Sequence, residues 1–170
     1  CCTHTNPSLP PRTMTASRLE IARQLAEKHG MDLLAPLVIG GSYVSAIEHQ
    51  GVVYVSGQVP RIGTTIVATG RVGETVSLSL AQTAAEVCAL RVLAILEQQF
   101  GLARIAHVLK LNVFTQSAAD FTQQSEVADA ASQLLVAVLG TGSGPHARTS
   151  VGVYQLPKNA VVEVVATVAL

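Results

Sequence analysis

Two charged residues interrupt apolar, strand-like segments of this chain. Only 13% of its 170 residues are charged. Arg148 lies near the start of one such segment, and Glu163 breaks the apolar run 160–165. A charge buried in a strand costs several kcal/mol unless it is paired, hydrated or functional. An arginine can hold a carboxylate through two parallel hydrogen bonds, and a glutamate can transfer protons. The alternative is structural, with both residues stabilising a sheet edge or a subunit interface.

The spacing of the last two strand-like segments suggests where these charges lie. If residues 147–155 and 160–169 form a hairpin with Gln155 opposite Ala160, Arg148 and Glu163 share one face of the sheet. They would then lie about 13 Å apart along the ladder. That separation is too long for a salt bridge but suits two groups that flank a small ligand.

Other polar residues offer weaker signals. Tyr43 begins a predicted strand, and Ser56 and Gly57 lie at the end of another, where backbone N–H groups could bind an oxygen ligand. His146 is expected to be a loop histidine, and Cys88 an inert thiol inside an apolar helix. The sequence contains no CxxC, HxH, HExxH, P-loop or GxGxxG motif.

Hydrophobic periodicity predicts the elements that position these residues. Helical spacing of apolar residues predicts a helix over 16–29 and two long helices, Ser77–Phe100 and Asp120–Leu139. Alternating or β-branched runs predict strands over Tyr43–Glu48, Val52–Ser56, Thr65–Ala68, His107–Thr115, Ala147–Gln155 and Ala160–Ala169. Two long helices on one face of a mostly antiparallel sheet form a two-layer α+β domain.

Composition limits the domain plan and the function classes. We expect a single domain over 14–170, with a core over 37–170, after a leader, tag or disordered tail at 1–13. So few charges predict an oligomer that buries apolar surface. A net charge of zero argues against nucleic acid as a partner, and the apolar runs are shorter than the ~18 residues of a membrane span. Three cysteines without a disulfide pattern favour a cytoplasmic protein.

Five short motifs occur in the order of a known family: GSYVSA at 41–46, VSGQVP at 55–60, ARTSVGV at 147–153, LPK at 156–158 and VEV at 162–164. Together they resemble the RidA (YjgF) family of enamine/imine deaminases over about residues 37–170. The N-terminal helix resembles that of a subgroup of larger members.

The resemblance implies a chorismate-mutase-like fold and a homotrimer with sites between subunits. It also implies that neither a metal nor an organic cofactor takes part. It implies hydrolysis of small reactive enamines and imines, such as 2-iminobutanoate or 2-iminopropanoate, to 2-keto acids and ammonia. Arg148 would hold the substrate carboxylate, and Glu163 would orient or activate water. Tyr43, Ser56, Gly57 and Ser150 would contribute to substrate binding.

The chain also departs from the family pattern. Ser150 replaces a frequent cysteine, Val165 a frequent acidic residue, and Asp129 aligns near a frequent asparagine. These departures leave two other functions open. One is a non-catalytic protein that binds small carboxylates in the same cleft, and the other is the endoribonuclease or translation-inhibitor activity attached to some relatives.

Overall fold

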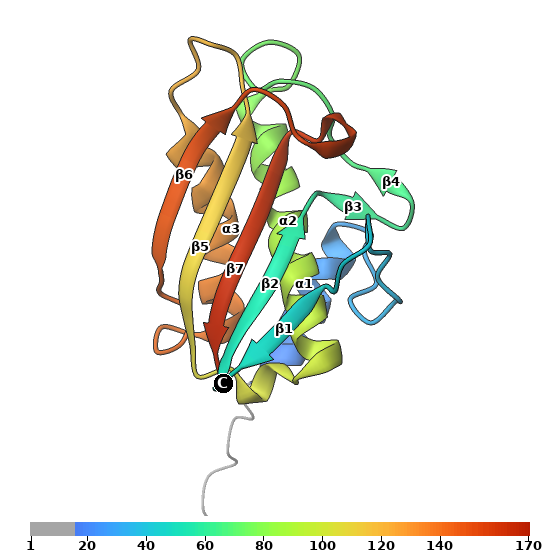
Figure 1. The fold of residues 1–170 in the computed structure, drawn as a ribbon, viewed down its shortest axis with the longest axis vertical. Coiled ribbons are helices and arrows are strands. Elements are labelled where there is room, and N and C mark those ends of the chain that lie inside the picture. The colour runs from blue at the N-terminus through green and yellow to red at the C-terminus, as the bar shows by residue number, and fades with distance from the viewer. Residues whose placement is uncertain (1–15) are drawn as a thin grey trace, which may run out of the picture.

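The computed structural model describes residues 16–170 (Figure 1). The tail expected at 1–13 lies outside the described residues. A five-stranded sheet has the order β1-β2-β7-β5-β6, and a separate two-stranded sheet joins β3 and β4. The strands are β1 (Ala46–His49), β2 (Val52–Gln58), β3 (Arg61–Ile62), β4 (Thr65–Ile66), β5 (His107–Gln116), β6 (Ala147–Val153) and β7 (Val162–Ala169). The helices are α1 (Arg18–Lys28), α2 (Leu78–Gln99) and α3 (Gln124–Leu139), with 3₁₀ turns η1 (Leu102–Arg104) and η2 (Pro157–Asn159).

The predicted hairpin between the last two strands is wrong. β5 lies between them, pairing parallel with β6 and antiparallel with β7. The chain reaches β6 from β5 through α3, which is the helical crossover that parallel neighbours require. It then crosses over β5 through η2 to enter β7. A short connection rich in turn-forming residues looks the same in sequence whether the strands it joins are adjacent or separated by a third.

The helices form where the sequence predicts them, with small differences at their ends. Ser17 and Glu20 form a reciprocal capping box at the start of α1, and Ser77 caps α2. α3 begins at Gln124 rather than Asp120, because the preceding residues form a turn. α2 is long and apolar enough to span a membrane by length and composition, but two-thirds of its apolar window (67%) is buried within the fold. Burial in the core accounts for its hydropathy.

All three helices lie on one side of the large sheet. In Figure 1, α2 and α3 lie behind the strands, and no helix crosses the near face. α1 packs on α2 and α3, burying Ala22 and Ala26 completely. The face away from the helices carries large exposed apolar side chains, Ile47 of β1, Tyr54 of β2 and Val151 of β6.

Candidate functional site

A bulge in β2 shapes the candidate site. Val55 pairs with Ala166 of β7, but the next paired residue, Gln58, faces Val164. Three steps along β2 therefore match two along β7, so β2 carries one extra residue. The extra residue turns the Gln58 side chain into the helix layer, where it is 6% exposed. It also leaves Gly57 beside Glu163 of β7.

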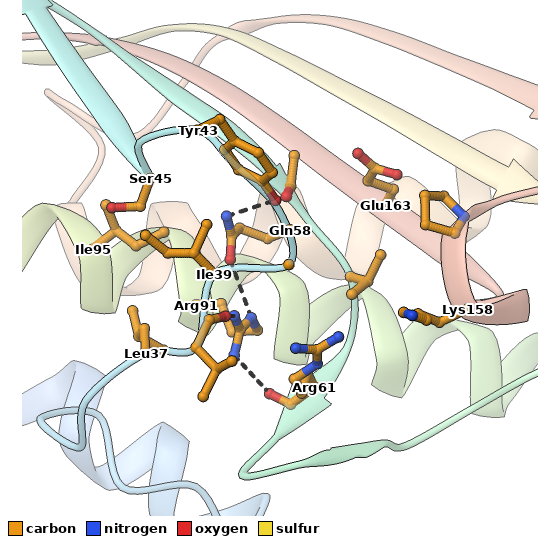
Figure 2. Close-up of a pocket in the computed structure, with 15 residues that line it drawn as sticks. Leu37, Ile39, Tyr43, Ser45, Gln58, Arg61, Arg91, Ile95, Lys158 and Glu163 are labelled. Carbon is orange, nitrogen blue, oxygen red and sulfur yellow. Dashed lines mark hydrogen bonds between the residues drawn. The ribbon is translucent and has the colours of Figure 1, made fainter.

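Glu163 and Gly57 lie in close contact. A Cβ atom on residue 57 would overlap the Glu163 carboxylate and lie 2.9 Å from its Cδ. Both residues line a cavity of about 190 Å³, together with Leu37, Val38, Ile39, Gly40, Tyr43, Ser45, Gln58, Val59, Arg61, Arg91, Ile95, Pro157 and Lys158. Figure 2 shows the carboxyl group of Glu163 at one side of this cavity. We call this cavity the Glu163 pocket.

The surroundings of Glu163 favour its protonated form. Within residues 16–170, its carboxylate takes part in no hydrogen bond or salt bridge. Partial burial raises the pKa of this carboxyl group from its ordinary value of 4.5. A raised pKa makes an ionised carboxyl group a stronger base, which suits it to accept a proton.

Three cations line the same pocket. Arg91 of α2 is 6% exposed, and its guanidinium donates to Gln58 Oε1 (3.1 Å), to the Arg61 carbonyl (3.1 Å) and to the Val38 carbonyl (3.4 Å). Arg91 thus ties α2 to β2, to β3 and to the loop before β1. Desolvation by burial lowers the pKa of Arg91.

Arg61 and Lys158 have no such partners. In the described part of the chain, neither side chain forms a hydrogen bond or an ion pair, and the Nε atom of Arg61 is buried without an acceptor. Lys158 sits in η2 with a positive φ of 60°. The Glu163 pocket therefore combines a carboxyl group of raised pKa with two cations that have no protein partner within residues 16–170.

Arg148 lies elsewhere, so the expectation that it shares a sheet face with Glu163 is wrong. Arg148 pairs with Leu111 of β5, and Glu163 pairs with Phe114. Leu111 and Phe114 are three residues apart on one strand and so point to opposite faces. Two strand spacings and three residues put the Cα atoms about 14 Å apart. The two side chains of one chain cannot reach the same small ligand.

On its own face, Arg148 contacts α3. Its Nη1 donates to Asp129 Oδ1 (2.7 Å) and to Ser132 Oγ (3.0 Å). Asp129 is half exposed, so this ion pair is partly hydrated. Ser150 also faces α3, where its hydroxyl donates to the Gln124 carbonyl (2.7 Å).

The remaining predicted residues have structural contacts. The Ser56 hydroxyl donates to the Val44 carbonyl (2.7 Å) and fixes the segment that carries Tyr43. His146 lies in the loop before β6, as expected, and contacts Ser132 and the Gly144 carbonyl. Cys88 is fully buried, as expected, and burial raises the pKa of its thiol well above the ordinary value, which disfavours the reactive thiolate.

Sequence reasoning singled out Tyr43, Gly57 and Glu163 but missed the cations of the pocket. Arg91 left a usable signal, since it interrupts the buried apolar stretch 87–96 of α2. Lys158 ends the motif LPK at 156–158, but sequence reasoning gave it no role. Arg61 left no signal, because it follows a proline at a turn where a surface cation is ordinary. Residues 16–170 contain no cluster of three or more histidine, cysteine, aspartate or glutamate side chains able to hold a metal ion.

Comparison with known proteins places this geometry in a family. The sequence pattern described as "Endoribonuclease L-PSP" matches residues 35–170. Protein TCP17 of Trypanosoma cruzi is 41% identical over 145 residues, covering 85% of this chain and 91% of that protein. A protein of unknown function from Agrobacterium tumefaciens is 36% identical, with a TM-score of 0.80 over 90% of this chain and 94% of that one.

A more distant structure shares the fold alone. Escherichia coli TdcF, solved with bound serine, is 23% identical, with a TM-score of 0.58 over 81% of this chain and 94% of its own. These neighbours confirm the two-layer, chorismate-mutase-like α+β fold. The chain belongs to the endoribonuclease L-PSP family, which is the RidA (YjgF) family that its five motifs resemble.

Proposed function

We propose that this protein is a hydrolytic deaminase that converts small 2-imino acids into 2-keto acids and ammonia in the Glu163 pocket. The observation that carries this proposal is the carboxyl group of Glu163, which is unpartnered in residues 16–170, has a raised pKa and faces a cavity lined by cations. Membership of the RidA family supports the reaction class. The serine bound to TdcF supports a ligand of amino-acid size.

The chemistry needs one group that moves a proton. Water adds its oxygen to the electrophilic imine carbon while Glu163 accepts a proton from it. Glu163 then passes that proton to the nitrogen, which gives a carbinolamine. Glu163 next takes the proton of the new hydroxyl group and passes it to the nitrogen as well, so the C=O bond forms as the C–N bond breaks, and ammonia leaves the 2-keto acid. The raised pKa suits Glu163 to these transfers. The absence of a side chain at residue 57 leaves the carboxylate free to face the substrate.

The role of Arg148 in this proposal requires a second subunit. Arg148 and Glu163 of one chain point to opposite faces of the sheet. In a homotrimer with sites between subunits, Arg148 of one chain holds the substrate carboxylate beside Glu163 of the next, and Ser150 lies two residues along the same strand. The exposed apolar side chains on the uncovered face of the sheet support such an association. Mass determination in solution tests the trimer.

Ammonia release tests the activity. An amino-acid oxidase generates 2-iminopropanoate or 2-iminobutanoate in place, and the rate of ammonia release is compared with that of spontaneous hydrolysis. We expect acceleration by the wild type and a loss of about 100-fold or more in Glu163→Gln. Glu27→Gln, which alters an exposed carboxylate on α1, should keep full activity. Wild-type protein that accelerates no imine would refute the proposal.

The same measurements distinguish two other functions. A carboxylate-binding protein without catalysis would bind 2-ketobutyrate at the pocket and turn over no imine. The name of the family suggests cleavage of RNA, but a net charge of zero offers little attraction to phosphates. Ribonuclease activity that survives Glu163→Gln and Arg148→Gln would come from a contaminant.

A further inference from the structure

The Glu163 pocket contains more positive charge than one monocarboxylate substrate needs. Arg61, Arg91 and Lys158 line it, while Glu163 is the one acidic residue that residues 16–170 contribute to its lining. The three cations differ in their partners. The guanidinium of Arg91 donates its hydrogen bonds to other residues of the chain and so stabilises the fold. Arg61 and Lys158 remain available to a ligand.

Arg61 is held in place without being neutralised. Its backbone carbonyl accepts a hydrogen bond from Arg91, which fixes the position of β3 beside α2. Its Nε atom is buried and has no acceptor within residues 16–170. Arg61 also helps to lower the pKa of Arg91, because the two positive charges lie close together. An unsatisfied, partly desolvated guanidinium beside another cation stabilises a bound anion.

Lys158 approaches the same space from the other side. Figure 2 shows the side chains of Arg61 and Lys158 extending toward one another, with Glu163 above them. Lys158 is exposed, and it is positioned by η2, the turn that leads into β7 and so to Glu163. The two cations therefore flank one end of the pocket in which Glu163 forms a side.

We propose that Arg61 and Lys158 bind a second anionic group of the substrate, so that the pocket prefers imino acids with an acidic side chain. This inference rests on the proposed function, in which Arg148 of a neighbouring subunit holds the carboxylate next to the imine. Arg61 and Lys158 then hold the side-chain carboxylate, and the imine carbon lies between the two anchors, beside Glu163. A cavity of about 190 Å³ has room for a four-carbon dicarboxylate.

Substrate preference tests the proposal. Imines of aspartate and of alanine are generated by oxidases, and kcat/KM is measured for each. We expect the wild type to favour the aspartate imine, and Arg61→Gln to lose about tenfold or more on that substrate alone, mainly through KM. Lys158→Gln should also lower kcat/KM on the aspartate imine. Because Lys158 is exposed, its replacement leaves the packing of the core unchanged. Arg23→Gln, which removes an exposed cation of α1, is the matched control. Equal losses on both imines, or no loss on either, would overturn the proposal.

Ligand binding separates this inference from the proposed reaction. Calorimetry compares succinate with butyrate, which has the same carbon chain and one carboxylate. We expect tighter binding of succinate by the wild type, and a loss of this difference in Arg61→Gln but not in Arg23→Gln. If no imine is hydrolysed but succinate still binds through Arg61, only the deaminase proposal fails. If imines are hydrolysed but succinate and butyrate bind alike, only the acidic-substrate proposal fails.

Discussion

The carboxylate of Glu163 lies directly against the backbone of Gly57, with no room for a side chain between them. The bulge in β2 creates this contact, because it places Gly57 opposite the segment of β7 that carries Glu163. The glycine is thus explained by space, since its φ is not in the left-handed region. The contact fixes which way the carboxylate can point.

Gly57→Ala should therefore strongly reduce activity while leaving the fold intact. The new methyl group would push the Glu163 carboxylate away, and the carboxylate is the far end of a flexible side chain that can move. We expect a fall in kcat/KM of about 100-fold, as for loss of a general base, with little change in Tm. Gly142→Ala, in a loop position with open space around it, is the control. Full activity in Gly57→Ala would show that the position of Glu163 is unimportant.

Glu163 should make stability depend on pH in a defined direction. Burial raises its pKa in the folded chain above 4.5, so folding disfavours the ionised form. The resulting destabilisation is absent at pH values below about 4.5 and is fully present above the folded pKa. Glu163→Gln should therefore have a higher Tm than the wild type at pH 7, and the gap should close as the pH falls.

Thermal unfolding between pH 4 and 8 measures this gap. Glu27→Gln provides the comparison, because Glu27 is exposed on α1 and should give no pH-dependent difference. A gap for Glu163→Gln that stays constant with pH, or that grows toward acid, would contradict the argument.

The Arg148–Asp129 ion pair should contribute little to stability. The side chains are 23% and 50% exposed, and pairs of this kind contribute about 0.2–1 kcal/mol. We expect Arg148→Gln to lower Tm by no more than about 4 °C. A double-mutant cycle with Asp129→Asn measures the coupling energy directly. A coupling energy well above 1 kcal/mol would show that Arg148 mainly stabilises its own chain, which would argue against its assignment as a substrate ligand.

Much of the fold could be predicted from sequence, since its signals are local. The helical spacing of Ser77–Phe100 and the alternation at His107–Thr115 correspond to α2 and β5 within one residue at each end. Which strands are neighbours is not a local property. The parallel pairing of β5 with β6 depends on α3 packing behind the sheet, so the register assumed for Gln155 and Ala160 failed.

The residues of the candidate site could be predicted only in part. The motifs around Gly57 and Glu163 identify two residues that the fold does bring together. The sequence indicated Arg148 and Glu163 equally as site residues. Their partners on β5 are three residues apart, however, so the two side chains lie on opposite faces of the sheet. Arg61 and Lys158 enter the pocket from turns whose course only the tertiary structure determines.

Subunit complementation tests most directly the claim that Glu163 of one chain and Arg148 of another form each site. Glu163→Gln and Arg148→Gln are each expected to be inactive when assembled alone. The two variants are then mixed in equal amounts, unfolded and refolded together, so that random trimers form. If the sites lie between subunits, one interface in four combines an intact Glu163 with an intact Arg148, and the mixture should regain about a quarter of wild-type ammonia release. Mixed protein that stays inactive, or Arg148→Gln that is active by itself, would contradict a shared site.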